Sequence, residues 1–160
     1  MLRAIWQLLG RILLTLGGPY VTPPMTVPGL TTGSAYAAND AFGTLFWYDV
    51  PKRGVINAAF YYDLDNEKIA KEFVLSPVMF TPTANDSAFA PVGGEIKNFI
   101  TIRITAGDFG TGFNANAIGQ VSGLGIPYVA PEGRLWCQLI TRGVDNIAAG
   151  SLPRVALAIL

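Results

Sequence analysis

The sequence predicts an all-β protein, an antiparallel β-sandwich of jelly-roll-like form that follows an N-terminal amphipathic helix and an extended arm. Short runs of β-branched and aromatic residues recur from residue 42 onward, and turns rich in glycine and proline separate them. Long stretches of helical periodicity do not lie between these runs. Strands and turns in that succession are typical of an antiparallel sandwich or barrel. We therefore divide the chain into an N-terminal helix and proline-rich arm, residues 1–34, and a sandwich domain, residues 35–160.

The first expected element is an apolar helix over residues 2–16. Its polar residues Arg3, Gln7, Arg11 and Thr15 recur every four positions, so that on a helix they form one narrow stripe. The rest of the helix surface is apolar and needs cover, which we expect a partner subunit to provide. The predicted interface residues are Leu2, Ile5, Trp6, Leu8, Leu9, Ile12, Leu13 and Leu16.

The sequence of this helix fits a membrane span or a secretory signal less well than docking on a partner subunit. A membrane span needs about 20 apolar residues. This run is shorter and would place Arg11 in hydrocarbon, so the sequence predicts no stable membrane span. Arg11 also interrupts the apolar centre that a secretory signal requires, and Gly17-Gly18-Pro19 does not form a small-residue cleavage site. A core helix of the same domain and a helix lying in the lipid interface remain alternatives.

Four prolines characterise the segment that follows, residues 17–35. Proline lacks the backbone donor of a sheet ladder, so these prolines exclude a central strand and favour extended, polyproline-like backbone. We expect an arm that leads away from the domain and whose unpaired backbone groups a neighbouring subunit satisfies. A plain linker is the alternative.

Roughly seven or eight strands are expected over residues 42–160. Pro77 indicates an edge position or a bulge between two of them. Residues 106–134 are predicted to form glycine-rich loops and short strands, with flexible or tightly turning backbone between Gly119 and Gly125. The main predicted strands span residues 42–50, 55–64, 73–75, 78–80, 99–105, 134–142 and 153–160.

Alternation of apolar and polar residues predicts which side chains enter the core. The pattern has a strict period of two between residues 100 and 104, and it returns in the last two predicted strands. The residues predicted to be buried are Ile100, Ile102, Ile104, Leu135, Cys137, Leu139, Val155, Leu157 and Ile159.

The charge composition bears on possible partners. Eleven Lys and Arg balance eleven Asp and Glu, and this zero net charge argues against a nucleic-acid-binding protein, which usually carries a basic excess. Charged residues make up 14% of the chain, against about 25% in ordinary domains. We expect neighbouring molecules to cover much of the surface, as in a homo-oligomer or a larger assembly.

The residue types needed for common catalytic sites are scarce. The chain has no histidine, which excludes Ser-His-Asp and Cys-His catalysis and histidine-ligated zinc. Cys137 is the only cysteine and falls in an apolar run, which favours an inert buried thiol. We therefore predict a non-enzymatic protein without catalytic residues, cofactor or metal.

Two further features of the sequence allow more than one interpretation. The run from Asp63 to Glu67 supplies oxygen ligands for calcium but lacks the remaining positions of an EF-hand loop, so a hairpin turn is favoured. The aromatic pairs Trp47-Tyr48 and Tyr61-Tyr62 offer stacking surfaces for a sugar. Consecutive residues of a strand face opposite ways, so at least one member of each pair is expected in the core.

One set of strand and turn residues in the sandwich region forms a familiar pattern, and it lies at 35–43, 54–56, 63–66, 73–75, 80, 82–83, 86–89, 135–140 and 152–160. With these residues the region resembles small β-sandwich structural proteins of tailed-bacteriophage virions, which decorate or cement capsids or form tails. The resemblance implies a non-enzymatic virion protein, a capsid cement or decoration protein that joins neighbouring major capsid or tail subunits. A receptor- or carbohydrate-binding module of a phage tail or fibre is the alternative.

Overall fold

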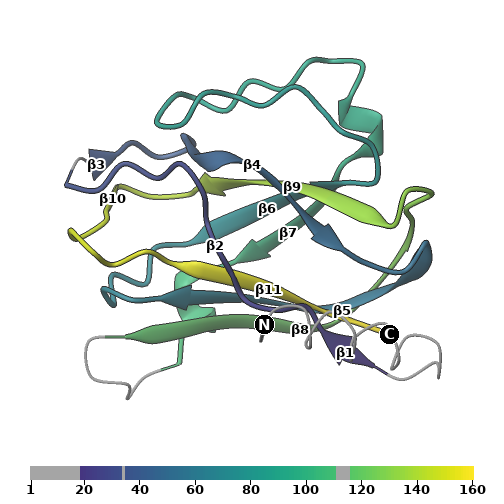
Figure 1. Ribbon diagram of the computed structural model, residues 1–160. Helices are drawn as coiled ribbons and strands as arrows, with labels where there is room; N and C mark the ends of the chain where they lie inside the picture. Colours follow the sequence, from purple (N-terminus) through teal and green to yellow (C-terminus); the bar gives the residue numbers. More distant parts are fainter. Residues whose placement is uncertain (1–18, 34, 111–115) are drawn as a thin grey trace.

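The computed structural model describes residues 19–33, 35–110 and 116–160, and these form antiparallel sheets packed face to face in a sandwich (Figure 1). The all-β prediction is therefore confirmed. The helix expected over residues 2–16, with all eight predicted interface residues, lies outside the described residues.

One layer of the sandwich is a five-stranded sheet. Four strands follow in the order β1-β11-β5-β8, and a fifth, β2, also pairs with β11. All of these pairings are antiparallel. The strands are β1 (Tyr20–Val21), β2 (Met25–Thr26), β5 (Arg53–Asp63), β8 (Ala117–Val129) and β11 (Arg154–Ile159).

The other layer is a four-stranded antiparallel sheet in the order β4-β9-β6-β7. At one end of the sandwich two short strands, β3 and β10, pair with each other, and two 3-10 helices, η1 (Ile96–Asn98) and η2 (Ala106–Asp108), flank β7. Eight of the described strands begin after residue 40, which agrees with the seven or eight expected. The strands of this layer and end are β3 (Ala35–Tyr36), β4 (Ala41–Asp49), β6 (Lys71–Ser76), β7 (Ile100–Ile104), β9 (Arg134–Thr141) and β10 (Asp145–Asn146).

The core lies between the two sheets and contains the predicted side chains with one exception. Eight of the nine residues predicted to be buried are buried, Cys137 among them. Ile100 is half-buried because it begins β7, which is an edge strand. Large aromatic side chains fill the centre, including Phe42, Tyr61 and Phe73.

The proline-rich segment does not lead away from the domain, which corrects the expectation of a free arm. Tyr20 and Val21 pair with the end of β11, and Met25 pairs with its beginning. Between them Thr22 donates its N–H to the Leu157 carbonyl and accepts the Leu157 N–H on its hydroxyl. The segment is thus an edge strand of its own sheet. Prolines are tolerated at an edge because only one side of the strand needs backbone donors.

The stretch predicted as glycine-rich loops contains the longest strand of the sandwich, β8, with 13 residues. Two features let the glycines enter a strand. A Cβ on Gly119 would lie 2.7 Å from a methyl group of Ile104, so this glycine permits close packing on β7. Gly123 and Gly125 adopt positive φ where the register with β5 shifts, which indicates a bulge. The expectation of flexible or tightly turning backbone was therefore wrong for most of this stretch.

Pro77 does not mark an edge strand. β6 lies inside its sheet, between β9 and β7, and Pro77 follows its last residue, Ser76. The proline therefore comes where the strand ends rather than where the sheet ends.

The loop of residues 77–99 folds over the outer face of the four-stranded sheet (Figure 1). A small second cluster beneath it contains Phe80 from the loop, Val74 from β6 and Ile140 from β9. The outer face of this sheet is therefore covered in part by the chain itself, and the loop leaves one end of the face open.

Among the described residues, no helix is long and apolar enough to cross a membrane.

Candidate functional site

An exposed tryptophan, Trp47, packs against the half-buried Trp136 where β4 forms the edge of the four-stranded sheet. Trp47 of β4 and Trp136 of β9 are directly opposite each other, with ring centroids 5.3 Å apart and planes tilted by 55°. The guanidinium of Arg134 lies 5.3 Å from the centre of the Trp47 ring. Trp47 keeps 41% of its surface exposed. The pair therefore offers an aromatic surface with one cation on the outside of the sandwich.

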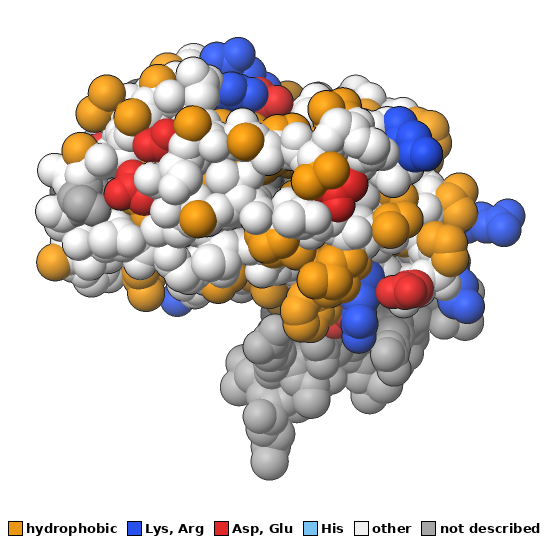
Figure 2. Space-filling model, turned by 90° about the horizontal axis from the view of Figure 1, so that it is seen from above, with side chains coloured by type: hydrophobic (Ala, Val, Ile, Leu, Met, Phe, Trp, Pro, Cys, Tyr) orange, Lys and Arg blue, Asp and Glu red, His pale blue; other side chains and the backbone are white. Residues whose placement is uncertain are grey.

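Apolar side chains extend this aromatic surface at the same end of the sheet. Trp136 pairs with Ser76, and the loop begins at the next residue, so Val78 and Met79 follow beside it. Both are exposed. With Pro77, Pro131 and Glu132 they line a shallow hollow of about 200 Å³. Figure 2 looks down on this side of the molecule and shows hydrophobic side chains gathered at one edge, with charged side chains beside them.

The other aromatic residues singled out in the sequence divide between core and surface. Tyr48 and Tyr61 are buried, so one member of each consecutive pair is in the core as expected. Tyr62 is half-exposed and stacks on Phe60 on the outer side of β5, with ring centroids 6.4 Å apart. The two outward-facing aromatic groups thus belong to different sheets.

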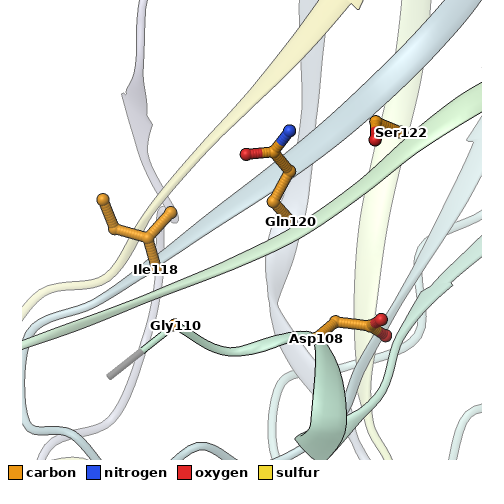
Figure 3. A pocket seen from close by; sticks show the side chains of 5 residues that line it. All are labelled: Asp108, Gly110, Ile118, Gln120 and Ser122. Atoms are coloured by element: carbon orange, nitrogen blue, oxygen red, sulfur yellow. The ribbon is translucent and has the colours of Figure 1, made fainter. Parts of the chain in front are cut away.

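A second hollow, of about 400 Å³, lies along β8 and is shown in Figure 3. Ile118, Gln120 and Ser122 alternate along the strand and line one side, and Asp108 lies across from them. The Asp108 carboxylate already accepts hydrogen bonds from the N–H and hydroxyl of Thr105. Among the described residues that line it, this hollow therefore presents an amide, a hydroxyl and a single carboxylate.

The most unusual group of side chains is buried at the end of the core near β10. The Nζ atom of Lys71 lies 2.6 Å from Oδ2 of Asp145, and the two side chains are 1% and 5% exposed. Lys71 also donates to the Ile69 carbonyl at 3.1 Å. The rings of Phe42 and Tyr61 lie 4.8 and 5.0 Å from Nζ. A lysine and an aspartate are thus held together among aromatic rings and largely away from water.

Three more carboxylates lie near this pair, one from the last residue of β5 and two from the loop between β5 and β6. Asp63 accepts the backbone N–H groups of the three loop residues 65, 66 and 68. Asp65 accepts the N–H of Ala148 at 3.0 Å, and Glu67 accepts the N–H of Asn146 at 2.9 Å. Glu67 also lies close enough to Asp145 to raise the pKa of its carboxyl group. These contacts fasten the loop to the segment that follows β9.

Burial shifts the pKa values of the central pair in opposite directions. Desolvation lowers the pKa of Lys71, although the attraction of Asp145 opposes this shift. Desolvation raises the pKa of Asp145, and the neighbouring Glu67 raises it further against the effect of Lys71. Both shifts favour the uncharged forms of the two groups.

The two acids at the start of the loop share a proton. Desolvation and the hydrogen bond with Asp63 raise the pKa of Asp65 to about 7. Burial alone would raise the pKa of Asp63, but the hydrogen bonds from Asp65 and from backbone N–H groups outweigh burial and lower it. Asp63 is therefore the ionised member and Asp65 the proton donor near neutral pH.

The run from Asp63 to Glu67 does not form the expected hairpin turn, because β5 and β6, which it joins, lie in opposite sheets. The chain turns locally around Asp63 instead. The Asp63 carboxylate is occupied by backbone N–H groups, as in an Asx turn. Asn66 and Lys68 take positive φ, which fits a tight turn. Within residues 19–33, 35–110 and 116–160, no group of three or more Asp, Glu, Cys or His side chains is arranged to hold a metal ion.

Sequence reasoning missed Lys71 and Asp145. The sequence held a signal for Lys71. Alternate residues of a strand face the same side, so Lys71 points into the core with Phe73 and Leu75. A charged residue in an inward register needs a partner. The sequence does not identify that partner, since Asp145 comes from a two-residue strand that lies between two predicted strands.

Comparisons with known proteins gave no match, whether with protein-family models, curated protein sequences or solved structures. The function is therefore inferred from the residues and geometry described above.

Proposed function

We propose that the chain is a non-enzymatic structural protein of a virus particle, a cement or decoration protein that joins neighbouring capsid or tail subunits. The feature that carries the proposal is the apolar stretch between Leu2 and Leu16, whose sequence predicts a helix that is apolar over most of its surface. The described strands bury a core of their own between the two sheets. We infer that a neighbouring subunit covers the apolar stretch.

The arrangement of the strands supports the same proposal. From β4 to β11 each step between strands of the two main sheets crosses to the opposite sheet, except the step from β6 to β7. Crossing of that kind is the basis of jelly-roll-like sandwiches, which build many capsids. We propose a jelly-roll-like sandwich with the N-terminal helix outside it.

The exposed apolar surface offers a second contact in such an assembly. Trp47, Val78 and Met79 lie at one end of the four-stranded sheet and are exposed. Aromatic residues and methionine are enriched in the cores of protein interfaces. A subunit that docks by its N-terminal segment has this surface available for a second neighbour, as a cementing role requires.

Purified particles of the virus that encodes the chain provide the test. We expect the chain to be present at a fixed ratio to the major capsid or tail subunit. Particles that assemble with Leu9→Asp and Ile12→Asp in the chain should lose it, because each substitution would bury an unpaired charge. The absence of the chain from purified particles would contradict the proposal.

A receptor- or carbohydrate-binding module is the second candidate, favoured by the Trp47–Trp136 pair. Sugar rings stack on exposed aromatic side chains, and Arg134 adds a hydrogen-bond donor next to the Trp47 ring. The 55° tilt between the two rings offers two short faces instead of one flat platform.

A further inference from the structure

The Lys71–Asp145 pair brings an amine and a carboxyl group into direct contact inside the protein. Lys71 begins β6 and Asp145 begins β10, 74 positions later in the sequence. Their side chains meet at 2.6 Å, nearly free of solvent. Two charges buried in this way bring little net stability, because the cost of desolvation offsets their attraction.

We propose that Lys71 and Asp145 condense to an intramolecular amide, an isopeptide bond that links their side chains, with Glu67 transferring the proton. The Lys71 Nζ atom forms a bond to the Asp145 Cγ atom. One C–O bond of the carboxyl group breaks, and its oxygen leaves as water with one proton from the amine and one from the carboxyl group. No oxidant, reductant or additional reactant is required.

The first requirement of this reaction is that both groups are uncharged, since an ammonium group has no lone pair and a carboxylate resists attack. The surroundings of the pair supply this condition. Burial lowers the pKa of the Lys71 amine and raises the pKa of the Asp145 carboxyl group. Transfer of one proton within the pair then gives the neutral amine and the neutral acid.

The second requirement is alignment in the absence of water. The rings of Phe42 and Tyr61 lie within 5.0 Å of Nζ and pack around the side chain. The Ile69 carbonyl holds the amine at 3.1 Å. Groups held in this way react at effective concentrations of about 10⁵–10⁸ M. Exclusion of water also favours condensation over hydrolysis of the product.

The third requirement is a group that moves the proton from the attacking amine to the leaving oxygen. Glu67 is held next to Asp145 by the N–H of the following residue, Asn146, at 2.9 Å. It raises the pKa of the Asp145 carboxyl group, and its side chain is exposed, so that solvent reaches it. Asp63 and Asp65 also lie near Lys71, but their carboxylates are engaged with the loop backbone and Ala148. Glu67 is therefore the group placed to move the proton in this step.

The product joins β6 covalently to the β3–β10 end of the sandwich. Such a link would resist forced separation of β6 from that end of the sandwich.

Intact-mass measurement of the denatured full chain, incubated until its mass is constant, tests the proposal. We expect a mass lower than that of the sequence by one water molecule, and a cross-linked peptide that contains Lys71 and Asp145 after digestion. Lys71→Met should keep the full mass, and the control Lys68→Met should lose water as the unsubstituted chain does. Asp145→Asn should lose ammonia instead and give the same final product.

The results that would overturn the proposal are equally specific. A full mass for the folded, unsubstituted chain, with free Lys71 in its peptide map, means that the pair is an ordinary buried ion pair. A cross-link that maps to another acid overturns the assignment of Asp145. Loss of water in Glu67→Gln at the unsubstituted rate overturns the role of Glu67. Because the unsubstituted chain decides the main point, unfolding of a variant does not obscure the outcome.

Discussion

The side chain of Gln138 forms two hydrogen bonds with the backbone of Thr83, although 54 residues separate them in the sequence. Its Oε1 accepts the Thr83 N–H at 3.0 Å, and its Nε2 donates to the Thr83 carbonyl at 2.7 Å. Nε2 also donates to the Gly43 carbonyl at 3.1 Å. One fully buried amide on β9 therefore holds the loop of residues 77–99 against the outer face of the sheet.

Gln138→Met should consequently destabilise the protein and release the loop. The substitution keeps the size of the side chain but leaves the Thr83 N–H and two carbonyls without this partner. Each buried group left unsatisfied costs about 1–3 kcal/mol. Urea unfolding and hydrogen exchange in residues 80–90 measure the two effects. Gln120→Met, at an exposed position of β8, should change neither, and equal effects of both substitutions would contradict this role.

Gly119→Ala tests the close packing that allows a glycine in β8. The new Cβ would lie 2.7 Å from Ile104 and 2.9 Å from the Phe109 ring, both of which are buried. Overpacking of this kind costs about 1–3 kcal/mol. Thermal unfolding of Gly94→Ala provides the control, because nothing lies within 4 Å of its Cβ position. Equal melting temperatures of the two variants would show that β8 is not packed in this way.

The raised pKa of Asp65 predicts a pH dependence of stability. Its pKa rises from 3.8 to about 7 on folding, so the folded state binds the proton more tightly than the unfolded state. The resulting stabilisation is fully present below pH 3.8 and is lost as the pH rises through about 7. Asp65→Asn mimics the protonated acid and keeps both hydrogen-bonding functions. Its free energy of unfolding should exceed that of the unsubstituted chain increasingly toward pH 8, and a constant difference would contradict the shared proton.

Trp47→Ala distinguishes the two proposed uses of the aromatic surface. Because the side chain is 41% exposed, the substitution should lower the unfolding free energy by only about 1 kcal/mol. In a carbohydrate-binding module it should abolish retention on glycan arrays. Tyr62→Ala, on the outer side of the opposite sheet, should leave that retention unchanged. If the unsubstituted chain binds no glycan, the carbohydrate-binding alternative is wrong, and a protein partner becomes the proposed ligand of this surface.

The sequence was informative where a single physical rule controls the outcome. Alternation of apolar and polar residues along 100–104 and 135–139 identified buried side chains. In a strand, alternate side chains face opposite sides of the sheet, so the apolar set marks the side that faces the core. The Asp63 turn was readable for a similar reason, since its hydrogen bonds are local. The strand at Ala117–Val129 was missed because its glycines serve contacts with Ile104 and a bulge against β5, which are both non-local.

The candidate sites could not be predicted from the sequence for the same reason, because their contacts are also non-local. Lys71 and Asp145 meet only because β6 and β10 are brought to one end of the core, and the partner of a buried lysine cannot be read from spacing. The pairing of residues 20–26 with β11 was hidden by prolines, which exclude a central strand but allow an edge. Thr22 completes the ladder there through its hydroxyl, a contribution that backbone propensity does not predict.

The central claim is that the sandwich folds without the N-terminal segment, which serves to attach it to a neighbour. Full burial of Leu8, Leu9, Ile12 and Leu13 contributes on the order of 6–12 kcal/mol before the costs of association. If the segment docks on another subunit, this free energy of burial is gained only when the subunits assemble.

Sedimentation velocity of the full chain and of residues 19–160 tests this claim most directly, with circular dichroism to confirm folding. The account predicts that the full chain forms oligomers and that the truncated chain is a folded monomer. Leu9→Asp with Ile12→Asp in the full chain should behave like the truncation. A truncated chain that unfolds, or one that forms the same oligomers as the full chain, would contradict it.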